Sequence, residues 1–81
     1  MAPVTLARFV KELEKLKQAS DAEKLKAQDY DARLARIIQE LREKGLDADR
    51  AATTAALADA VKRGIITLPV QVHLQHRLGL T

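Results

Sequence analysis

Apolar side chains recur at regular helical spacing between Leu6 and Leu41. Four of them are separated by multiples of seven residues, and four others each follow a position of that series by three. This is the spacing of the a and d positions of a helix that packs on another helix. We call these residues the heptad stripe: Leu6, Phe9, Leu13, Leu16, Tyr30, Leu34, Ile37 and Leu41. Residues 6–44 contain no glycine or proline and consist mostly of strong helix formers, so the pattern predicts helix throughout.

The centre of the heptad stripe is polar, which leaves two arrangements open. Ser20 and Glu23 stand where the series predicts apolar residues, and they have the spacing of a capping box that could begin a new helix. A hairpin that turns there would bury the stripe within one chain, whereas a continuous helix would bury it between chains. The phase of the stripe is kept from Leu13 to Leu34, which a hairpin does not require. We therefore favour one continuous helix over residues 6–44, with a helical hairpin as the alternative.

Glycines divide the rest of the chain into further elements. Gly45 can end the first element in a left-handed conformation, and Asp47 or Asp49 can cap the next helix. This second helix is rich in alanine and is predicted over residues 47–63, because Gly64 then repeats the glycine ending.

The last segment fits two patterns. Residues 65–74 alternate between apolar and polar side chains, which is typical of a strand. The aliphatic residues also have helical spacing, and Thr67 can cap a helix that carries Pro69 in its first turn. Because a single strand would have nothing to pair with, we predict a short C-terminal helix over residues 67–78. The expected fold class is all-α.

The chain is short for a protein that must bury a core. It has 81 residues and no cysteine, so no disulfide can stabilise it. Because a lone long helix cannot bury its apolar stripe, we predict an oligomeric helical bundle, with a homodimer joined by coiled-coil contacts favoured. No apolar run approaches the length of a membrane span, and the N-terminal residues lack the apolar core of a signal peptide. We expect a soluble cytoplasmic protein that does not bind a membrane.

The net charge of +3 is unevenly placed along the chain. Residues 1–59 carry eleven basic and eleven acidic residues, so this part sums to zero. Residues 60–81 carry three basic residues, both histidines and no acidic residue. An uncompensated basic end of this kind can attract an acidic partner or a phosphate backbone.

The sequence predicts neither an enzyme nor a cofactor site. Its one serine, Ser20, lies in a charged stretch, and the chain has no cysteine and no glycine-rich phosphate loop. His73 and His76 are three residues apart and would share a helix face, but no carboxylate follows Asp59 to complete a metal site. We interpret both histidines as surface or interface residues and expect no metal.

Ala60, Gly64 and Val70 have the spacing of the alanine, glycine and aliphatic residue of the bacterial helix-turn-helix, which this segment partly resembles. The sequence departs from that motif at three positions where buried aliphatic residues are usual: Asp59, Arg63 and His73. The resemblance implies a small dimeric DNA-binding regulator that uses residues 55–78, with the second helix of the motif in the major groove.

We predict a non-enzymatic protein–protein interaction module of adaptor, inhibitor or chaperone type, which self-associates through the heptad stripe. The DNA-binding regulator is the alternative. In either case, the expected surface for another protein or for nucleic acid consists of Lys62, Arg63, Val70, Gln71, Leu74, Gln75, His76 and Arg77.

Overall fold

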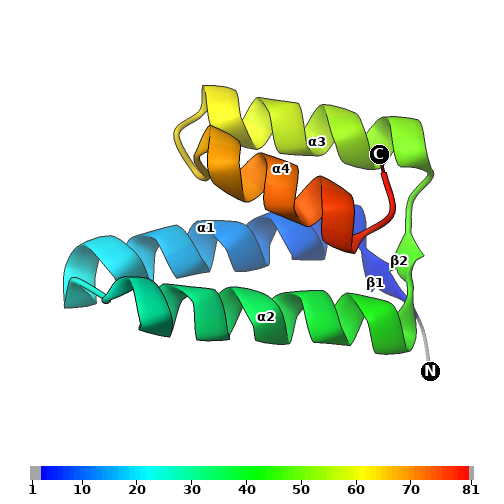
Figure 1. Ribbon diagram of the computed structural model, residues 1–81. Coiled ribbons are helices and arrows are strands. Elements are labelled where there is room, and N and C mark those ends of the chain that lie inside the picture. The colour runs from blue at the N-terminus through cyan, green and yellow to red at the C-terminus, as the bar shows by residue number, and fades with distance from the viewer. Residues whose placement is uncertain (1–2, 81) are drawn as a thin grey trace.

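Two helical hairpins, one packed on the other, make up the computed structural model of the protein, which describes residues 3–80 (Figure 1). The first hairpin pairs α1 with α2, and the second pairs α3 with α4. Two short strands lie next to the helices in the chain: β1 directly precedes α1, and β2 lies between α2 and α3. In chain order the elements are β1 (Val4–Thr5), α1 (Leu6–Glu23), α2 (Ala27–Lys44), β2 (Leu46–Asp47), α3 (Arg50–Lys62) and α4 (Leu68–Arg77). The described chain is thus mostly helical, as the sequence predicts, and no helix in it combines the length and apolar character that a membrane span requires.

Side-chain caps fix the start of three helices. The hydroxyl of Thr5 accepts a hydrogen bond from the Arg8 N–H at 3.2 Å and opens α1. Asp49 does the same for α3 by accepting from the Ala52 N–H at 2.7 Å. Thr67 caps α4, as predicted. Each cap satisfies a backbone N–H that has no partner within its helix, so these boundaries are set locally by the sequence.

The favoured continuous helix over residues 6–44 is wrong, because the chain reverses at residues 24–26. α1 ends at Glu23, and Lys24 adopts the left-handed conformation with φ 52° and ψ 54°. Ser20 does not cap a new helix: it lies inside α1, and its carbonyl accepts from the Lys24 and Leu25 N–H groups. The reversal lets α2 return along α1, which buries the apolar stripe without a second chain.

The left-handed residue at the turn leads to a stability prediction. A side chain in this conformation costs about 1 kcal/mol, whereas glycine adopts it freely. We expect Lys24→Gly to raise the free energy of unfolding by up to about 1 kcal/mol, measured by urea denaturation followed by circular dichroism. Lys26→Gly is the control, because Lys26 has an extended backbone with φ −72° and gains nothing from glycine. If Lys24→Gly lowered the free energy of unfolding as much as Lys26→Gly does, the left-handed conformation of Lys24 would be contradicted.

The heptad stripe lies in the core of the chain itself. Five of its residues are buried, and Leu6, Tyr30 and Ile37 are partly buried against them. Ile38 replaces Ile37 as the buried residue of the last turns of α2. Among residues 3–80, the buried apolar side chains are Val4, Phe9, Leu13, Leu16, Leu34, Ile38, Leu41, Leu57, Ala60, Ile65, Ile66 and Leu74. Burial also raises the pKa of the Tyr30 hydroxyl above its ordinary value of 10.0, so this group stays protonated at neutral pH.

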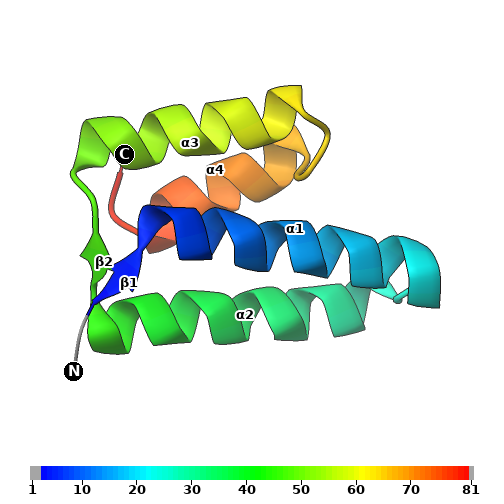
Figure 2. The ribbon, with the colours of Figure 1, turned by 180° about the vertical axis from the view of Figure 1, so that it is seen from behind.

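The pairing of β1 with β2 has no counterpart in the sequence predictions. The strands run parallel, with Val4 opposite Leu46 and Thr5 opposite Asp47. The Val4 N–H also donates to the Gly45 carbonyl at 2.9 Å. Figure 2 shows this pair at the end of the α1–α2 hairpin that lies away from its turn. The pair therefore ties the start of α1 to the end of α2 and closes the hairpin at its open end.

Candidate functional site

Helix α4 is apolar on two opposite sides. Leu74 is completely buried on the side that faces the core. Leu68 and Val72 lie on the other side with 64% and 50% of their surface exposed. Within residues 3–80 these are the only large hydrophobic side chains that are strongly exposed. An isolated exposed leucine needs no explanation, but two that are four residues apart on one helix form a contiguous apolar surface.

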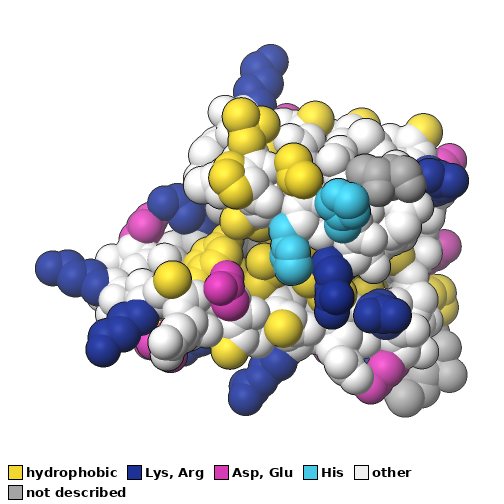
Figure 3. All heavy atoms as spheres, in the orientation of Figure 1, with side chains coloured by type: hydrophobic (Ala, Val, Ile, Leu, Met, Phe, Trp, Pro, Cys, Tyr) yellow, Lys and Arg dark blue, Asp and Glu magenta, His cyan; other side chains and the backbone are white. Residues whose placement is uncertain are grey.

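The exposed side of α4 consists of two rows of side chains at helical spacing. Leu68, Val72 and His76 follow one another four residues apart, and so do Pro69, His73 and Arg77. We call these six residues the α4 face. Figure 3 shows hydrophobic side chains over the start of α4, then both histidines, then Lys and Arg side chains towards its C-terminal end. The face therefore changes from apolar to basic along the helix.

A groove runs between the second of these rows and α2. It has a volume of about 530 Å³, and α4 contributes Pro69, Val70, His73 and Arg77 to its walls. On the opposite wall α2 contributes Asp31, Leu34 and Ala35. Asp31 is the only acidic residue among the residues that line it. The groove thus extends the α4 face with aliphatic side chains, and its polar lining consists of His73, Arg77 and Asp31.

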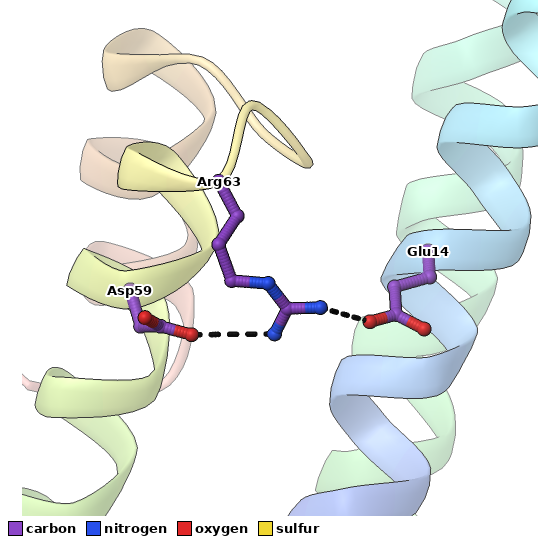
Figure 4. Close-up of polar contacts among 3 residues, drawn as sticks. All are labelled: Glu14, Asp59 and Arg63. Atoms are coloured by element: carbon purple, nitrogen blue, oxygen red, sulfur yellow. Dashed lines mark hydrogen bonds and ion pairs between the residues drawn. The ribbon is translucent and has the colours of Figure 1, made fainter.

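Arg63, predicted as part of the partner surface, is held by two carboxylates. Its guanidinium bridges Asp59 of α3, at 3.2 Å, and Glu14 of α1 (Figure 4). Hydrogen bonds to Asp59 and then to Glu14 raise the pKa of Arg63 above its usual value. This side chain therefore joins the second hairpin to the first, and its charge is already compensated within the chain.

The other predicted surface residues differ in their accessibility. Lys62, His76 and Arg77 are exposed, and the side chains of Val70, Gln71 and Gln75 are half-buried. Leu74 has no exposed surface, so its assignment to a partner surface is wrong. The predicted partner surface left out Leu68, Pro69, Val72 and His73, although His73 was interpreted as a surface or interface residue. The spacing of Leu68, Val72 and His76 could have indicated them, once Leu74 was known to face the core.

The likeness to a helix-turn-helix is confined to the turn. Ala60 is buried and Gly64 has φ 77°, as that motif requires, but Asp59, Arg63 and His73 are exposed where it has buried aliphatic residues. The first residues of α3 and the residues that follow α4 line one hollow, so α4 runs back along α3. A helix-turn-helix instead crosses its two helices at a steep angle, about 90–120°.

The residues from 3 to 80 include no group of three histidine, cysteine, aspartate or glutamate side chains placed to hold a metal ion. The α4 face carries imidazole, guanidinium and aliphatic groups. Such groups bind partners through charge and apolar contact.

No model of a protein family, no curated protein and no solved structure matches the chain.

Proposed function

We propose that the protein is a non-enzymatic, cytoplasmic interaction module whose α4 face binds an acidic amphipathic helix of another protein. The observation that carries the proposal is the exposed row of Leu68 and Val72 beside the basic end of α4. An amphipathic helix would place its apolar side chains on this row and over the groove to α2. Acidic residues at its margin would then lie near His73, His76 and Arg77.

Charge favours an acidic partner over a second copy of the chain. The α4 face carries Arg77 and no carboxylate, so a second copy of this face would bring no negative charge to pair with the guanidinium. Leu68 and Val72 alone are also too small a patch for a stable homodimer, which needs about 800 Å² from each subunit. The main reason to predict self-association was that the heptad stripe needed a second chain to cover it. This reason no longer holds, because the chain's own helices already cover the stripe.

The test compares two matched double variants as bait. In Leu68→Ser/Val72→Ser the apolar row is removed from α4, and in Ala51→Ser/Ala55→Ser an exposed row of α3 is changed in the same way. Both should remain folded, because surface substitutions usually change stability by less than about 0.5 kcal/mol. A protein captured by the wild type and by the α3 variant, but not by the α4 variant, is then purified and titrated.

We expect the purified partner to carry an acidic amphipathic segment and to bind the α4 variant at least tenfold more weakly, a loss of about 1.4 kcal/mol or more. Added salt should also weaken its binding to the wild type. If the α3 variant and the α4 variant lost the same amount of affinity for the partner, the proposal would be refuted. A light-scattering mass that doubles with concentration in the wild type, but not in the α4 variant, would instead identify a second copy of the chain as the occupant.

A further inference from the structure

Three arginines from three different helices line one hollow at the end of the molecule where β2 lies. They are Arg42 in the last turn of α2, Arg50 at the start of α3 and Arg77 at the end of α4. The hollow has a volume of about 470 Å³, which is within the range of small-molecule sites. These residues are 8 and 27 positions apart in the sequence, so only the fold brings them together.

The charge of this hollow is poorly compensated. None of the ion pairs formed between residues 3 and 80 includes Arg42, Arg50 or Arg77. Asp49 is the one acidic residue of the lining, and its carboxylate already caps α3 by accepting from the Ala52 N–H at 2.7 Å. Three guanidinium groups and one carboxylate leave a net charge of +2 around the hollow.

Arg50 lies at the helix end that favours negative charge, where the Asp49 cap supplies one carboxylate. Arg42 and Arg77 lie in the last turns of their helices, where the helix dipole favours a positive charge. Arg50 is the first residue of α3, where the dipole favours a negative charge. An anion in the hollow would interact favourably with Arg50 and with the N-terminal end of α3 at once.

The remaining walls of the hollow are apolar. Leu41 is buried, and Leu46, Leu78 and Leu80 are half-buried around the arginines. Thr53 adds no free polar group, because its hydroxyl donates to the Asp49 carbonyl at 2.8 Å. A ligand that fits this lining needs an oxyanion for the guanidinium groups and an apolar body for the leucines.

We propose that this hollow, the three-arginine pocket, binds a small amphiphile in which a carboxylate or phosphate is carried on an apolar body. Guanidinium groups bind either oxyanion through paired N–H donors. The pocket shares Arg77 with the α4 face but does not depend on the proposed protein-binding function. Arg77 also lines the α4 groove, but Arg42 and Arg50 do not, so substitutions at these two residues test the pocket alone.

The experiment titrates the full chain, labelled for NMR, with four probes: octanoate, octyl phosphate, inorganic phosphate and the neutral octyl glucoside. We expect saturable amide shifts for residues that line the pocket with one or both octyl anions. Inorganic phosphate should bind more weakly, because it lacks the apolar body. The relative affinities of octanoate and octyl phosphate distinguish a carboxylate ligand from a phosphate ligand.

Arg50→Gln should weaken binding of the octyl anion at least tenfold, while the amide spectrum outside the pocket stays unchanged. Arg36→Gln is the matched control, because Arg36 is also exposed and forms no ion pair within residues 3–80, yet lies outside this pocket. Equal binding of octyl glucoside, an unchanged affinity in Arg50→Gln, or shifts confined to another surface would overturn the proposal. Inorganic phosphate binding as tightly as octyl phosphate would overturn the apolar part of the ligand assignment.

Discussion

Phe9→Ala is expected to lower the free energy of unfolding by about 3–5 kcal/mol. Phe9 has no exposed surface and is the only phenylalanine of the chain. Its removal takes the largest apolar group out of the core and leaves a cavity that the neighbouring helices fill only in part. A domain of this length has a total stability of about 4–12 kcal/mol, so the loss is a large fraction of the total and should lower the urea midpoint strongly.

Urea denaturation followed by circular dichroism measures this loss. Leu68→Ala is the control, because Leu68 is 64% exposed and its truncation should change the free energy of unfolding by less than about 0.5 kcal/mol. A loss below about 1 kcal/mol in Phe9→Ala would show that Phe9 does not lie in a well-packed core. The helical hairpin of α1 and α2 would then be wrongly assembled.

Local signals in the sequence predict the start of most helices correctly. Thr5, Asp49 and Thr67 each provide a side-chain oxygen three residues before the N–H that it accepts from, and this depends on no distant residue. The C-terminal segment is helical for the same reason, although its alternating pattern is also compatible with a strand. The lack of a predicted partner strand and the Thr67 cap both favour the helix, where hydrophobic spacing does not decide.

The choice between a hairpin and a continuous helix could not be made from the heptad stripe. Both arrangements bury the same residues, in one case within a chain and in the other between chains. The reversal depends on Lys24, a non-glycine residue in the left-handed conformation that nothing in its sequence context indicates. Contacts between the helices hold the reversal, among them the ion pair of Arg8 on α1 with Glu40 on α2 at 2.9 Å.

The candidate site was only partly predictable because the rotation of α4 about its axis depends on tertiary packing. Val70 and Leu74 lie on one side of this helix, and Leu68 and Val72 lie on the other. Both sides are apolar, so the sequence alone does not show which side faces the core. The ion pair between Arg63 and Glu14 could not be predicted from the sequence either, because the two residues are 49 positions apart. The basic character of the C-terminal end could be recognised directly, since it follows from composition.

Leu34→Asp is expected to unfold the monomer. Leu34 is only 3% exposed and lies on α2 in the core, so the new carboxylate would be removed from water without a partner. The penalty is several kcal/mol and approaches the total stability of a chain of this length. If the heptad stripe instead joined two chains, the same substitution would separate them and leave folded monomers.

Circular dichroism and light scattering on the same samples distinguish these outcomes. We expect Leu34→Asp to lose most of its helical signal, whereas the wild type has the mass of one chain. Ala35→Asp is the control: it places the same charge on the next residue, which is exposed, and should remain helical. A wild-type dimer that Leu34→Asp converts into helical monomers would contradict the burial of the stripe within one chain. The hairpin would then have to open to supply that interface, and the pairing of α1 with α2 would occur between chains.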